Sequence, residues 1–196
     1  MSATGILGGT LSGLLSACMW PAMLLGGNIA MDSGRSVLVI RVFKTGVFSA
    51  LGHDHKIEAP IKAGTVGLAP QPAVTLGVEA RKLRVVDPEV SAETRAEIQH
   101  TMEGPAVLDA ERFPDISFRS MRVESIGADR WTVRGDLTLH GQTRPVAVDV
   151  ARQGRHYRGS ATLKQREFGM TPVSIAGGTI KVKDEVKVEF DIVLSQ

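Results

Sequence analysis

Two segments in which apolar and polar side chains alternate strictly, joined by a short turn, constrain the fold of this chain more than any other feature. They occupy residues 131–150, and their apolar positions run from Trp131 to Val150. A period of two with one apolar face is what a half-buried β-strand requires. Gly141 can adopt the positive φ of a tight hairpin. Pro145 cannot donate a ladder hydrogen bond and belongs at a strand start or a sheet edge. The pattern predicts an antiparallel hairpin.

The same alternation recurs along most of the chain after residue 35. It predicts strands over residues 36–43, 46–51, 61–68, 73–81, 116–121, 157–164 and 179–194. Residues 92–103 differ and predict one surface helix, with Ser91 as its N-cap, Glu93 in its first turn and Gly104 at its end. About eight to ten strands at this spacing are typical of an all-β barrel or sandwich. One apolar face per strand favours an antiparallel sheet that is solvated on its other face.

Length and charge restrict the class of protein. The chain has 196 residues, enough for one domain and a targeting segment. It carries 23 Lys and Arg against 21 Asp and Glu, a net charge of +2, which gives no electrostatic reason to expect a nucleic-acid partner. Cys18 is the single cysteine, so no disulfide can form within the chain.

The N-terminal segment reads as targeting or anchoring sequence. No charged residue precedes Asp32, and residues 6–30 are apolar and rich in glycine. We interpret residues 1–30 as a signal peptide or an N-terminal hydrophobic anchor. A third alternative is lipidation at Cys18, because residues 15–18 resemble a bacterial lipobox. We therefore expect a periplasmic or secreted protein, with membrane association through residues 1–30 as an open alternative and a folded domain over residues 36–195.

Several stretches resemble the YceI-like family of exported bacterial lipocalin-like barrels. They are residues 107–120, 135–146, 167–170 and 180–186, and their order and spacing fit as well. The resemblance implies an eight-stranded antiparallel barrel with one accessory helix at about 92–103. It also implies an apolar interior that holds a polyisoprenoid or a similar long-chain amphiphile, usually in the periplasm.

Large side chains on the predicted inward faces are the candidate ligand contacts. An eight-stranded barrel is just wide enough either to be filled by its own side chains or to enclose one ligand. Both outcomes demand inward Val, Leu, Ile and Phe, so the sequence leaves both open. The candidates are Phe48, Phe118, Trp131, Leu137, Leu139 and Phe190.

A Gly-His-Asp-His segment is the sharpest chemical feature of the chain. If the segment is an extended strand, His53 and His55 project to the same side, about 6.5 Å apart at their Cα atoms. Two imidazoles can bind a divalent metal, but zinc needs at least a third protein ligand, for which His140 and His100 are candidates. The alternative is a strand-end turn at Gly52 whose histidines bond to nearby carbonyls or solvent.

These observations favour a binding protein over an enzyme. The chain has no nucleophile elbow, no phosphate-binding glycine loop and no catalytic cysteine in its folded part. We expect a barrel that binds a hydrophobic or amphiphilic small molecule, with an isoprenoid lipid as one candidate, for carriage or storage. One alternative is a metal-binding protein or metal-dependent enzyme that uses His53 and His55. Another is a filled barrel acting as an envelope-stress accessory protein. The oligomeric state stays open.

Overall fold

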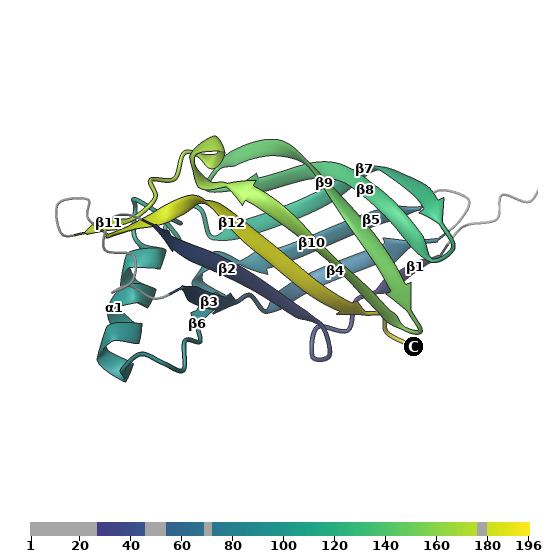
Figure 1. The fold of residues 1–196 in the computed structure, drawn as a ribbon. Helices are drawn as coiled ribbons and strands as arrows, with labels where there is room; N and C mark the ends of the chain where they lie inside the picture. Colours follow the sequence, from purple (N-terminus) through teal and green to yellow (C-terminus); the bar gives the residue numbers. More distant parts are fainter. Residues whose placement is uncertain (1–26, 46–53, 69–71, 176–179) are drawn as a thin grey trace, which may run out of the picture.

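One antiparallel sheet that curls on itself forms most of the molecule (Figure 1). The computed structural model describes residues 27–45, 54–68, 72–175 and 180–196. The strands within these ranges are β1 (Asn28–Ala30), β2 (Val37–Thr45), β3 (His55–Glu58), β4 (Ile61–Gly67), β5 (Ala73–Glu79), β6 (Arg84–Val85), β7 (Asp115–Gly127), β8 (Arg130–Leu139), β9 (Gln142–Gln153), β10 (His156–Lys164), β11 (Ser174–Ile175) and β12 (Ile180–Val193). The predicted strand over residues 46–51 lies outside the described residues.

The described sheet has twelve strands, so the expected count of eight was wrong, although the all-β antiparallel class is confirmed. The strand order is β1-β4-β5-β7-β8-β9-β10-β12-β2-β3-β6, and β11 pairs with β12. Eight of the strands have seven residues or more, namely β2, β4, β5, β7, β8, β9, β10 and β12. The extra strands are short. β3 is separated from β4 by Ala59 and by Pro60, whose missing N–H interrupts a ladder.

The first strand joins two distant parts of the sheet. β1 pairs with β4, and just after it Met31 forms a bridge with Leu194 beyond the end of β12. The backbone N–H of Ser195 donates to Ala30 O at 2.8 Å. The sheet therefore begins before residue 36, the expected start of the domain, because residues 28–31 find backbone partners on both sides.

The predicted hairpin is confirmed. β8 pairs with β9 from Arg130 opposite Ala151 to Leu139 opposite Gln142. The turn residues His140 and Gly141 have φ of 51° and 69°, and positive φ at both central positions matches the twist of the flanking strands. The hairpin therefore places the apolar faces of both strands on the same side of the sheet.

The predicted helix is also confirmed, with the same bounds. α1 (Ala92–Glu103) begins after Ser91, whose Oγ accepts a hydrogen bond from the N–H of Thr94 at 3.2 Å, and it ends at Gly104. Its Met102 is buried in a cluster with side chains from β3, β5 and β6. α1 therefore packs at one end of the curled sheet (Figure 1).

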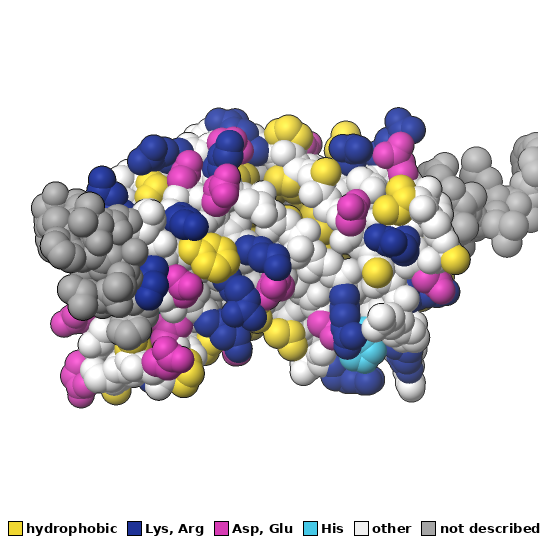
Figure 2. All heavy atoms as spheres, viewed as in Figure 1, with side chains coloured by type: hydrophobic (Ala, Val, Ile, Leu, Met, Phe, Trp, Pro, Cys, Tyr) yellow, Lys and Arg dark blue, Asp and Glu magenta, His cyan; other side chains and the backbone are white. Residues whose placement is uncertain are grey.

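Two 3-10 helices complete the described elements, η2 (Ala80–Lys82) and η3 (Gln165–Phe168). Residues 167–170 form a turn at the end of η3: Phe168 is 1% exposed, and Gly169 has φ of 74°. Phe168 belongs to the same buried cluster as Met102, at the helix end of the sheet. A second, smaller cluster comprises Met31, Ile61, Ile192 and Leu194. On the outer face, acidic and basic side chains are interspersed, as Figure 2 shows for one side of the molecule.

Candidate functional site

An apolar cavity of about 530 Å³ lies inside the curled sheet. Inward side chains of the long strands line it, together with Met102 of α1. The polar side chains that reach it come from Ser117, Arg152, Tyr157 and Gln165. The sheet is therefore hollow, and the side chains facing the hollow can contact a ligand mainly through apolar surface.

Five of the six candidate ligand contacts line this cavity. They are Phe118, Trp131, Leu137, Leu139 and Phe190. Phe48, the sixth, lies outside the described residues. The smaller lining residues were not among the candidates; they include Leu38, Ile40, Val42, Val148, Val186 and Val188. Their signal was the same alternation, but nothing in a single sequence ranks one inward valine above another.

An aromatic pair stands where β8 and β10 bring their side chains together. The rings of Trp131 and Tyr157 are 6.1 Å apart between centroids, and the guanidinium of Arg152 lies 6.0 Å from the centre of the indole. The Nη2 of Arg152 also donates to Asp129 Oδ1 at 2.5 Å, which holds the guanidinium in place at this part of the cavity lining. These side chains therefore combine a wide apolar surface with one fixed positive charge.

His55 and His140, the two described histidines of the predicted metal site, each have another partner. Nδ1 of His55 lies 2.7 Å from Oδ2 of the buried Asp87, whose Oδ1 accepts from the N–H of Lys56 at 2.6 Å. Nδ1 of His140 lies 2.9 Å from the carbonyl oxygen of Phe168, so each ring is held by its own neighbour.

Within the described ranges, no three His, Cys, Asp or Glu side chains gather closely enough to hold a metal ion. His53 lies outside those ranges, so the structure leaves the pairing of His53 with His55 as a prediction. The structure adds that Asp87 orients the ring of His55. No spacing in the sequence could indicate this contact, because His55 lies in β3 and Asp87 lies in the segment after β6.

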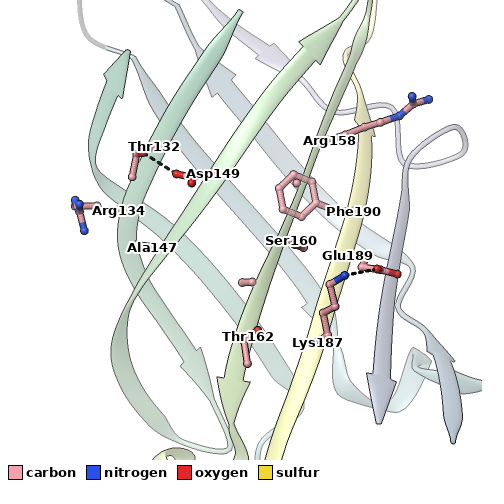
Figure 3. Close-up of a pocket in the computed structure, with 12 residues that line it drawn as sticks. Thr132, Arg134, Ala147, Asp149, Arg158, Ser160, Thr162, Lys187, Glu189 and Phe190 are labelled. Atoms are coloured by element: carbon pink, nitrogen blue, oxygen red, sulfur yellow. Dashed lines mark hydrogen bonds and ion pairs between the residues drawn. The ribbon is translucent and has the colours of Figure 1, made fainter. Parts of the chain in front are cut away.

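A second hollow lies on the outer face of β8, β9, β10 and β12 and has a volume of about 850 Å³ (Figure 3). Its rim is polar and largely paired. Thr132 Oγ1 donates to Asp149 Oδ1 at 2.7 Å, and Lys187 Nζ lies 2.9 Å from Glu189 Oε1. Its floor includes Gly159, Ala161 and Phe190. We call this hollow the outer groove.

A curled antiparallel sheet around an apolar cavity, with one helix at its end, defines a class of small β-proteins with an internal ligand-sized space. The model of the YceI-like domain matches residues 38–194, and the chain therefore belongs to the YceI-like family. This agrees with the resemblance in the sequence.

Curated relatives with the name UPF0312 protein match part of the chain. One from Pseudomonas savastanoi pv. phaseolicola is 31% identical over 103 residues, which is 47% of this chain and 54% of the relative. Another, from Vibrio cholerae, is 29% identical over 92 residues, or 42% of this chain and 47% of the relative. The matched region spans about half the length of these relatives.

Solved structures share the fold. BcnA from Burkholderia cenocepacia superposes with a TM-score of 0.60 at 18% identity, covering 84% of this chain and 99% of BcnA. A polyisoprenoid binding domain from Saccharophagus degradans, implicated in plant cell wall breakdown, superposes with a TM-score of 0.52 at 11% identity, covering 85% of this chain and 97% of that domain. At these identities the likeness concerns the fold alone.

Proposed function

We propose that the protein binds a long-chain hydrophobic or amphiphilic molecule whose chain occupies the internal cavity. The apolar lining of a cavity of about 530 Å³ is the observation that carries the proposal. Pockets for small molecules are typically about 300–1,000 Å³ and mainly apolar, so the size and the lining both suit a ligand. Membership of the YceI-like family and the fold shared with a polyisoprenoid binding domain support the same conclusion.

The energetics favour a chain-like ligand. Each buried methylene contributes about 0.8 kcal/mol, so a long hydrocarbon gains affinity steadily with the length that enters the cavity. Among the described residues, none of those lining the cavity is a histidine or a carboxylate, the usual general acids and bases. The described lining therefore supports binding, and we propose carriage or storage of an isoprenoid-type lipid as its use.

Ligand content and a cavity-filling variant test this proposal. Native mass spectrometry of the full chain, followed by solvent extraction, should reveal a co-purifying lipid, and delipidated protein should rebind a polyprenol. Leu137→Trp should weaken polyprenol binding because the indole occupies part of the cavity.

Thr138→Trp adds a comparable ring to the next residue of β8, whose side chain points to the opposite face. It should bind as the unmodified chain does. Equal affinity of the two variants, or an empty protein that rebinds no polyprenol, would overturn the proposed function.

We also propose export, on the strength of the uncharged apolar residues 6–30. No helix among the described residues is long and apolar enough to cross a membrane. Cell fractionation of the native producer, with N-terminal sequencing and mass measurement of the mature chain, distinguishes cleavage, lipidation at Cys18 and retention as an anchor. Full-length unmodified protein confined to the cytoplasm would contradict export.

A further inference from the structure

The ladder between β9 and β10 covers only part of the two strands. It runs from Gln153 opposite His156 to Asp149 opposite Ser160 and stops there. β9 nevertheless begins at Gln142, and β10 continues to Lys164. In these segments β9 stays paired with β8, and β10 stays paired with β12. The sheet is therefore interrupted between the first half of β9 and the second half of β10, and Figure 3 shows the two strands diverging.

The interruption has defined limits, and we call it the lateral window. Its upper limit, on the side of the turn between β9 and β10, is the last ladder pair, Asp149 with Ser160. At its lower limit, η3 follows β10 and is tied back to β9, because Nε of Arg144 donates to the carbonyl oxygen of Glu167 at 2.9 Å. Continuing the ladder would place Pro145 opposite Lys164, and proline has no N–H to donate there. The missing N–H of Pro145 therefore disfavours extension of the ladder across the lateral window.

The lateral window lies between the outer groove and the internal cavity. Val148 of β9 and Leu163 of β10 face the cavity from either side of the window. Ala161 and Phe190 line both the cavity and the outer groove. The thin part of the wall therefore consists of one small side chain and one aromatic ring.

Phe190 lies at the upper limit of the window, beside Gly159. The two residues are cross-strand partners, and a Cβ at Gly159 would lie 2.6 Å from Cζ of Phe190. The ring therefore covers the backbone where glycine leaves a gap. Rotation of a side chain is a far smaller motion than separation of paired strands, so Phe190 is the side chain best placed to open or close the wall.

We propose that the hydrophobic chain of the ligand enters and leaves sideways, through the lateral window, and that Phe190 controls its passage. The inference rests on the proposed function, because it assigns a route to the ligand that the cavity is proposed to hold. It deepens that function by naming the residue that controls how fast the ligand is loaded.

Rates measured on variants at two places test the route. The probe is cis-parinaric acid, a long-chain fatty acid that fluoresces in apolar surroundings, mixed with delipidated full-length protein in a stopped-flow instrument. Phe190→Ala should raise the loading rate constant by about tenfold, which corresponds to about 1.4 kcal/mol in barrier height. The release rate constant should rise by at least as much, because the ring also lines the cavity. Trp131→Ala removes a cavity-lining ring that is not part of the outer groove, and it should act mainly on the release rate.

If Trp131→Ala accelerates loading and Phe190→Ala does not, entry past the aromatic pair replaces the window and the inference is wrong. If neither the unmodified chain nor any variant binds the probe or a polyprenol, the proposed function itself is wrong. The two failures are therefore distinguishable.

A cross-link across the window provides an independent test. In a Cys18→Ser background, Ala147→Cys with Thr162→Cys places thiols on the outer face at either side of the window, where a short bismaleimide can bridge them. The bridged protein should load about tenfold more slowly than before bridging.

The control is Asp149→Cys with Ser160→Cys, bridged by the same reagent at the last ladder pair, where the strands are already joined. It should load at the unbridged rate. Equal loading rates for the two bridged proteins would overturn the lateral route. Where bridging is incomplete, the loading rate of Phe190→Ala decides between the two routes.

Discussion

Phe190 packs its ring over the backbone of Gly159 on the neighbouring strand, in the space that is free because glycine has no Cβ. A Cβ at position 159 would lie 2.6 Å from Cζ of Phe190, closer than real Cβ contacts allow, and it would also meet the carbonyl oxygen of Asp149. This pair connects the stability of the wall to the proposed route through it.

Gly159→Ala should therefore destabilise the protein by about 1–3 kcal/mol, because the ring and the facing backbone must both shift. Urea unfolding followed by circular dichroism measures the change. Adding Phe190→Leu should recover part of the loss, because it removes the clash with the ring. The recovery should be incomplete, because the clash with the carbonyl oxygen of Asp149 remains. If the two substitutions add without interaction, the packing of Phe190 on Gly159 has no energetic weight.

Asp191 should contribute pH-dependent stability. Burial acts to raise its pKa, but hydrogen bonds from Arg158 and His156, at 2.7 and 2.8 Å, outweigh burial and hold the pKa below the ordinary 3.8. A carboxyl whose pKa is lowered by folding stabilises the folded state above its unfolded pKa, and this contribution is lost as the pH falls through the folded value.

The unfolding free energy of the unmodified chain should exceed that of Asp191→Asn at pH 6, and the difference should shrink between about pH 5 and pH 2. Chemical denaturation at a series of pH values measures both. Taking the difference between the two proteins cancels the titration of the groups that do not contact Asp191. A difference that stays constant, or that grows in acid, would contradict the assignment.

The N-cap of α1 should be worth a measurable amount. Ser91→Ala removes the acceptor for the N–H of Thr94 and should cost about 1 kcal/mol. Thermal unfolding should then show a melting temperature lower by roughly 2–4 °C. Ser91→Asp keeps a capping oxygen and should restore most of the stability. A full loss in both variants would show that the contribution of Ser91 is not capping.

The metal-binding alternative makes its own prediction. If the Gly-His-Asp-His segment binds a metal, the purified full-length chain should carry close to stoichiometric zinc, copper or iron, and the double variant His53→Ala with His55→Ala should lose it. Elemental analysis measures this directly. His156→Ala, which removes a histidine bonded to Asp191 on β12, serves as the control. Unchanged metal content in the double variant would reject this alternative.

Local chemistry made several elements predictable. Ser91 and Gly104 mark the two ends of α1 because their side-chain and backbone properties act within one turn of the helix. Gly141 marks the hairpin because positive φ is a property of the turn itself. The inward faces of β8 and β9 follow from the alternation, because side chains on a strand must point to opposite sides.

Other relationships depend on segments that are far apart in the chain. Nothing near His55 in sequence indicates that Asp87 will hold its ring. Residues 28–31 have the composition of a leader's end, yet Met31 becomes part of a buried cluster because β4 and the end of β12 supply partners on both sides. Such contacts depend on how strands meet in space, and a single sequence carries no local signal for that.

The sequence alone was sufficient for the all-β class, the helix, the hairpin and the face of each strand that is turned away from water, because these depend on alternation and on turn chemistry over a few residues. Tertiary structure decided that the interior is hollow and that β9 pairs with β10 only from Asp149 to Gln153. The physical reason is that an apolar face serves a filled core and a ligand cavity equally well. Only the curvature of the whole sheet, and the places where its ladders stop, determine how much space remains inside and from which side it can be reached.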